Sequence, residues 1–153
     1  MTFIGSIFLA LSMFIQAGEA SSIIDDLFSP TEHAQLTTAN SLNDRIKVYV
    51  KASKRIHLML QDAAVKKESG AVPAILQLWT SLLDKSVEDI EANLKPKKKP
   101  KNLKKYEIQL RKAIKDLEDF KVSAPIDLRE DYEAFLNRAE TIRNRFVEIL
   151  FQH

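Results

Sequence analysis

The chain has 153 residues, enough for one domain with its own hydrophobic core. It contains no cysteine, which excludes disulfides, thiolate metal sites, covalent haem attachment and cysteine nucleophiles. Its 23 basic and 21 acidic residues nearly balance, whereas a dedicated nucleic-acid-binding domain usually carries a large basic excess. Only three glycines and five prolines occur, a composition that favours helices over a turn-rich β-sandwich.

The first twenty residues, MTFIGSIFLALSMFIQAGEA, are typical of an export signal. Residues 3–15 form an uncharged apolar stretch as long as a signal-peptide core and short for a bilayer crossing. Gly18 and Ala20 place small residues at the third and first positions before a cut after Ala20. The sequence therefore predicts a signal peptide over residues 1–20, although no Lys or Arg precedes its apolar core. The alternatives are an uncleaved membrane anchor and a buried N-terminal helix.

Predicted export combined with the lack of cysteine suits a bacterial envelope better than a disulfide-dense animal secretion. We therefore expect an exported protein of the bacterial periplasm or the extracellular space. An uncleaved anchor would instead hold it at the membrane.

Residues 21–40 form a polar lead-in that contains one short helix. Ser29 is a suitable helix cap, Pro30 suits the first helical position, and Glu32 stands three residues after the cap. The segment HAQLTTAN that follows is polar and short. The sequence thus predicts a short helix ahead of the main domain.

Residues 41–153 contain four long stretches with helical periodicity of their apolar residues. The first begins at Ser41 and is expected to end at residues 69–70; the others cover about 72–94, about 102–122, and a final segment capped by Asp127 and Glu130. The residues expected to face a common core are Leu42, Ile46, Tyr49, Ser53, Ile56, Leu60, Ala63, Val72, Ile75, Leu76, Trp79, Leu82, Leu83, Val87, Ile90, Leu94, Leu103, Tyr106, Leu110, Ala113, Ile114, Leu117, Phe120, Leu128, Tyr132, Phe135, Leu136, Ala139, Ile142, Phe146, Ile149 and Leu150.

The predicted fold class is all-α, an up-down-up-down four-helix bundle preceded by the short helix and the signal peptide. The last three helices have matched lengths of about 30–35 Å at ~1.5 Å per residue. Matched lengths joined by short links favour antiparallel neighbours. No repeat of fixed period appears, so a solenoid is not expected.

The segment LKPKKKPKNLKK, residues 94–105, holds seven lysines and no acid. Alternating helices would bring it to the same end as the start of the first helix and the end of the fourth, where the N-terminal segment would also emerge. The candidate anion-contacting residues at this end are Arg45, Lys47, Lys51, Lys95, Lys97, Lys98, Lys99, Lys101, Lys104, Lys105, Arg143 and Arg145. The opposite end is expected to collect Asp116, Glu118, Asp119, Asp127, Glu130, Asp131 and Glu133.

Three interpretations of the lysine segment compete. It is first a solvated connector, in which Pro96 and Pro100 separate two helices and like charges keep the loop extended. It is alternatively a surface for phospholipid head groups, acidic envelope polymer or nucleic acid. A nuclear localisation sequence has a similar composition, but the upstream export signal argues against it. Lys104 and Lys105 favour the second interpretation, because cations near a helix N-terminus are unfavourable on folding grounds alone.

The sequence assigns no catalytic, cofactor-binding or metal-ligating residue. His33, His57 and His153 lack the Glu-x-x-His and His-Glu-x-x-His spacings of bundle metal sites, and His57 is expected to be a packed or half-exposed imidazole. Trp79 is expected in the core.

We therefore expect a non-enzymatic helical module of the cell envelope, structural or interacting with an unknown protein partner. The alternative is peripheral binding of an anionic surface through the lysine-rich end, with no nucleic acid partner expected.

Overall fold

The computed structural model describes residues 27–152, and its regular elements in that range are helical, which confirms the all-α expectation there. The elements are α2 (Pro30–Thr38), α3 (Leu42–Val65), α4 (Val72–Asn93), α5 (Leu103–Ser123) and α6 (Arg129–Phe151), with 3₁₀ turns at Ser69–Ala71 and Ile126–Leu128. The predicted signal peptide and cleavage site, the start of the lead-in and His153 lie outside the described residues. No helix within residues 27–152 is long and apolar enough to cross a bilayer.

Two predicted helix starts are confirmed. The Ser29 hydroxyl accepts the Glu32 backbone N–H at 3.2 Å, and the Glu32 carboxylate accepts the Ser29 N–H at 2.8 Å, a complete capping box. Ser41 caps α3 by accepting the Asp44 N–H at 3.1 Å. The predicted caps of α6 are wrong, because a 3₁₀ turn precedes that helix and Leu128, without a capping side chain, occupies its N-cap position.

The end of α3 also differs from the prediction. The helix stops at Val65 rather than at residues 69–70, and Lys67 adopts the left-handed conformation with φ 56°. The Glu68 and Lys67 N–H groups bond to the carbonyls of Ala63 and Ala64 at 2.9 and 3.3 Å. This is the Schellman arrangement, in which glycine usually occupies the position that Lys67 holds here.

The direction of the helices follows from contacts at constant sequence offsets. Three contacts join α3 to α5: Asn43 with Asn102 at 2.8 Å, Val50 with Gln109 at 3.3 Å, and His57 with Asp116 at 3.6 Å. All three pairs are 59 positions apart, which requires that α3 and α5 run parallel. Asp84 with Arg138 and Glu91 with Arg145 share an offset of 54, so α4 and α6 are also parallel.

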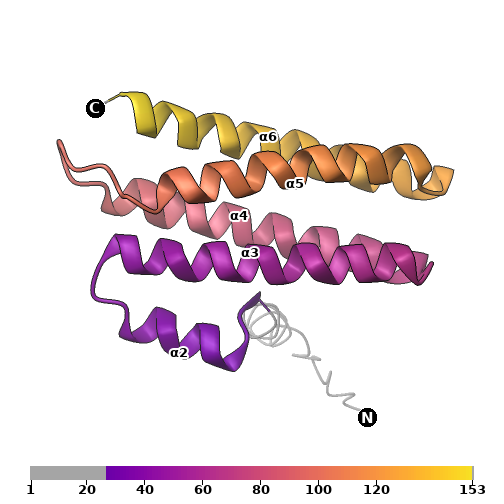
Figure 1. Ribbon diagram of the computed structural model, residues 1–153, viewed down its shortest axis with the longest axis horizontal. Helices are drawn as coiled ribbons and strands as arrows, with labels where there is room; N and C mark the ends of the chain where they lie inside the picture. The colour runs from indigo at the N-terminus through magenta and orange to yellow at the C-terminus, as the bar shows by residue number, and fades with distance from the viewer. Residues whose placement is uncertain (1–26, 153) are drawn as a thin grey trace, which may run out of the picture.

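Helices α3 and α6 each pack against α4 and α5, so consecutive helices α4 and α5 lie diagonally opposite. The expectation that helices consecutive in the chain are neighbours fails at this pair. The connection across the diagonal is the lysine segment, which lies at the end of the molecule where α3 begins and α6 ends (Figure 1).

Trp79 is fully buried in the core, as predicted. Its indole N–H donates to the Ser53 hydroxyl at 2.8 Å, and its ring lies 4.8 Å from Phe135 and 5.1 Å from His57, centroid to centroid. Of the residues predicted to face inward, all are buried or partly buried. The sequence missed Val48 and Ala52, which are buried because α2 packs on a second face of α3.

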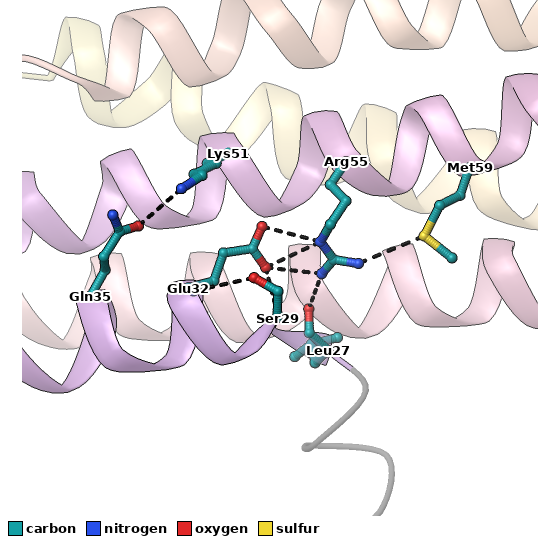
Figure 2. A network of polar contacts seen from close by, with 7 residues as sticks. All are labelled: Leu27, Ser29, Glu32, Gln35, Lys51, Arg55 and Met59. Carbon is teal, nitrogen blue, oxygen red and sulfur yellow. Dashed lines mark hydrogen bonds and ion pairs between the residues drawn. The ribbon is translucent and has the colours of Figure 1, made fainter.

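A charged network attaches α2 to α3 (Figure 2). The Arg55 guanidinium donates to both oxygens of Glu32 at 3.0–3.2 Å and to the Leu27 carbonyl at 2.8 Å. Glu32 is only 1% exposed. Leu27 therefore lies beside Arg55, well inside α3, so the chain enters the described structure on the flank of α3 and not at the lysine-rich end as the sequence predicted.

Burial alone would raise the pKa of Glu32, but the hydrogen bonds from Arg55 and from the Ser29 N–H outweigh it and hold the pKa below its ordinary value of 4.5. A carboxylate whose folded-state pKa is depressed stabilises the fold above its unfolded-state pKa. That contribution is lost as the pH falls through the folded-state value.

We predict that Lys67→Gly raises the free energy of unfolding by about 0.5–1 kcal/mol, because glycine adopts positive φ without steric strain. Urea denaturation measures the change. Lys66→Gly is the matched control, since Lys66 has right-handed helical geometry and glycine should weaken that position. Equal effects of the two variants would contradict the assignment of strain to Lys67.

We predict that Glu32→Gln lowers the free energy of unfolding by about 1–3 kcal/mol at neutral pH, because Arg55 loses its charged partner. The deficit should shrink as the pH falls below 4.5 and through the lowered folded-state pKa, where wild-type Glu32 becomes protonated. Urea titrations over a pH series measure both effects, with the exposed Glu133→Gln as control. A pH-independent deficit would show that the charge of Glu32 contributes nothing.

Candidate functional site

The helix directions bring the twelve predicted cations toward the same end, but acids occupy several of them. The ion pairs are Arg45 with Asp89 at 2.8 Å, Lys47 with Asp44 at 2.9 Å, Arg143 with Glu107 at 3.2 Å and also with Glu140, and Arg145 with Glu148 at 2.7 Å and also with Glu91. Lys51 instead reaches the Gln35 side chain of α2 at 3.4 Å. These five cations therefore serve contacts within and between helices.

The remaining seven cations are the lysines of the diagonal loop and the first turn of α5. They are Lys95, Lys97, Lys98, Lys99, Lys101, Lys104 and Lys105, all of them exposed. None makes an ion pair with another residue between positions 27 and 152. The structure thus separates a set of paired cations from a set of seven lysines without acidic partners.

The loop that carries these lysines is fixed at three points. The Lys98 N–H bonds to the Lys95 carbonyl at 3.2 Å, a tight turn in which Lys97 has φ 62°. Pro100 is buried beneath the loop. At its end, Asn102 donates its backbone N–H to the Asn43 side-chain oxygen at 2.8 Å and its side-chain amide to the Asn43 carbonyl at 2.9 Å. The loop is therefore attached to the start of α3.

An open hollow of about 610 Å³ lies between this loop and the start of α3. Its lining consists of Asn40, Ser41, Leu42, Asn43, Arg45, Asn93, Lys95, Lys98, Lys99, Pro100 and Lys101. The lining includes five cations and no acidic residue. We call this feature the basic hollow.

Asp89 holds one wall of the basic hollow in place. It accepts hydrogen bonds from Arg45 Nε at 2.8 Å and Nη2 at 3.2 Å, from the Tyr49 hydroxyl at 2.6 Å, and from Asn93 Nδ2 at 2.8 Å. Burial alone would raise the pKa of Asp89, but these donors hold it below 3.8. Burial and donation to Asp89 raise the pKa of Tyr49, which keeps its hydroxyl a donor. Arg45 is therefore held in a fixed orientation.

His57 is half-buried, as the sequence predicted. It packs against Trp79, with Nε2 3.6 Å from an Asp116 oxygen. Burial lowers the pKa of His57, against the opposing charge of Asp116. His33 is exposed on α2. No group of three His, Asp or Glu side chains suited to a metal ion occurs within residues 27–152.

Sequence reasoning named the lysines but missed the groups that fix them. The sequence predicts Tyr49 in the core without a polar role and assigns Asn43, Asn102 and Asp89 no role at this end, because single polar residues on helices are usually solvated. The one available signal is that Arg45 and Tyr49, four positions apart, share a helix face. Their partner Asp89 is 40 or more positions away and follows only from the packing of α3 on α4.

Comparison with protein-family models, with curated proteins and with solved structures found no match to this chain.

We predict that Tyr49→Phe lowers the free energy of unfolding by about 1.5–3 kcal/mol at pH 7, because the hydroxyl donates to a charged carboxylate. Tyr106→Phe, which removes a buried hydrogen bond to the neutral Ser86 hydroxyl at 3.0 Å, should lower it by about 0.5–1.5 kcal/mol.

The Tyr49→Phe deficit should narrow as the pH falls below 3.8 and through the lowered pKa of Asp89, because protonation of Asp89 removes the charge that the hydroxyl contacts. The Tyr106→Phe deficit should stay constant over the same range. Chemical denaturation over the pH series checks both, and parallel pH profiles would contradict the role given to Asp89.

Proposed function

We propose that α3 to α6 form an up-down-up-down four-helix bundle that serves as an exported, non-enzymatic interaction module. Its basic end binds an anionic phospholipid surface. The observation that supports this proposal is the set of seven exposed lysines on and beside the diagonal loop, which have no acidic partner among residues 27–152.

Charge placement on this scale needs an explanation beyond folding. Nearby cations such as Arg143 and Arg145 each contact two acids, so the same region of the molecule offers partners that the seven lysines do not use. Lys101, Lys104 and Lys105 also lie at or before the positive end of the α5 dipole, where cations are unfavourable by a few tenths of a kcal/mol each. An anionic surface would supply partners for these lysines and offset the unfavourable interaction with the helix dipole.

The arrangement of the loop suits a flat anionic surface. The lysines lie at one end of the helices and are exposed, so several can contact a membrane at once. Each contributes roughly 1 kcal/mol near an anionic leaflet, and the sum decreases as salt screens the charges. The described chain begins on the flank of α3, and α2 runs alongside α3, so the seven lysines stay exposed at this end.

We predict that the protein without residues 1–20 co-sediments with phosphatidylglycerol-containing vesicles at low salt and is released as salt rises. The triple variant Lys97→Ala, Lys104→Ala, Lys105→Ala should bind about a hundredfold more weakly, from three losses of roughly 1 kcal/mol.

The matched control is Lys54→Ala, Lys112→Ala, Lys115→Ala, which removes the same charge from exposed positions on the sides of α3 and α5. It should retain most of the binding. Equal losses of vesicle binding in the two triple variants would show that binding depends on net charge alone and not on the position of the lysines. Absence of binding at all salt concentrations would refute the proposal, and retention by an acidic polysaccharide alone would move it from lipid to envelope polymer.

A further inference from the structure

We infer that the basic hollow is a binding site for a phosphate monoester, the group that a phosphatidic-acid-type head group presents. The inference rests on the proposed function, because it specifies what the basic end recognises at the surface. It adds a defined pocket with fixed donors to the seven mobile lysine charges.

Asn43 supplies the first fixed donor. Because the Asn102 backbone N–H can only donate, Asn43 must direct Oδ1 toward it, and this sets the orientation of the whole amide. Asn43 Nδ2 then has no hydrogen-bond partner within residues 27–152. Nδ2 is also not a buried polar atom that lacks a hydrogen bond; within the described residues, that atom is Gln109 Oε1. Nδ2 is thus an available donor on a residue that lines the hollow.

Arg45 supplies the second. Asp89 occupies its Nε and Nη2, and this leaves Nη1 without a partner in the described chain. The position of Asp89 is itself fixed by Tyr49 and Asn93. The guanidinium therefore keeps the two N–H groups of Nη1 and part of its charge for the hollow, in an orientation that needs no rearrangement on binding.

The backbone of α3 adds two more donors. The N–H groups of Leu42 and Asn43, in the first turn of this helix, have no acceptor in residues 27–152, because Ser41 takes the N–H groups of Asp44 and Arg45. Both residues line the hollow. First-turn N–H groups and the helix dipole attract anions.

The ligand class follows from this set of groups. Four lysines from the loop supply charge, while Asn43, Arg45 and the α3 N-terminus supply oriented donors. Apart from the Asn side-chain oxygens and the Ser41 hydroxyl, the polar side chains lining the hollow are donors only. A phosphate monoester offers three terminal oxygens and close to two negative charges, which use more donors than the two terminal oxygens of a diester.

Asn43→Asp provides an isosteric test. The carboxylate can still accept the Asn102 N–H, and an acid in the first turn of α3 is favourable for the helix, so the fold should be retained. The available donor, however, becomes a negatively charged acceptor inside the hollow. Asn137→Asp is the matched control, because it makes the same charge change at an exposed position of α6 outside the hollow.

Binding is measured to vesicles containing phosphatidic acid or phosphatidylglycerol, matched in zeta potential, and to glycerol 3-phosphate in solution by amide NMR shifts. We expect a preference for phosphatidic acid that Asn43→Asp reduces about tenfold to a hundredfold and Asn137→Asp leaves nearly unchanged. Thermal unfolding of both variants checks that the fold is intact.

The three probes distinguish failure of the phosphate site from failure of the proposed surface function. Suppose that glycerol 3-phosphate binds, that Asn43→Asp weakens this binding, and that neither vesicle type binds. This result would support the basic hollow as a site for a soluble phosphate monoester and refute the proposed surface function. Equal binding to both vesicle types, with the two variants indistinguishable, would overturn the phosphate site while leaving surface binding in place. Absence of binding to all three probes would overturn both.

Discussion

The loop of residues 94–102 has to cross the end of the helices, because it joins α4 to α5 and these two helices lie on a diagonal. A link between adjacent helices would turn at the edge and leave the end of the core uncovered. This one passes over the end, buries Pro100, and is fastened to the start of α3 through Asn43 and Asn102. That path keeps the segment at the surface, where it can carry exposed lysines at little cost to the core.

The same packing determines which cations have acidic partners. Parallel pairs α3 with α5 and α4 with α6 hold side chains at fixed offsets of 59 and 54 positions, and this lets single arginines meet acids on neighbouring helices. Arg138 and Arg145 meet acids of α4 in this way. Arg45 and Arg143, which are partly buried, meet acids across the antiparallel pairs α3 with α4 and α5 with α6. The loop lysines lie beyond the last turn of α4 and outside those registers, so the described part of the chain brings no acid to them.

The exposed lysines and the oriented donors at the basic end contribute to anion binding in different ways. Exposed lysines on flexible stems give a charge-dependent attraction that any anionic surface satisfies and that salt weakens. Asn43 and Arg45 are oriented by partners in the fold, and oriented donors discriminate between anions because they lose little conformational entropy on binding. The network of Glu32 and Arg55 is separate from these groups and attaches α2 to the flank of α3 (Figure 2).

Local patterns in the sequence determined a large part of this protein. The Ser29 and Ser41 caps, the inward residues of the long helices and the burial of Trp79 all depend on residues within four positions of one another or on helical periodicity. The tertiary structure decided the rest. It closed α3 at Lys67 without a glycine, buried Val48 and Ala52 under α2, and put α4 and α5 on a diagonal. Asn43 with Asn102 and Arg45 with Asp89 meet across 59 and 44 positions. A sequence pattern of period 3.6 records which face of a helix is apolar, but not which helix that face meets or in what register, and only packing fixes those.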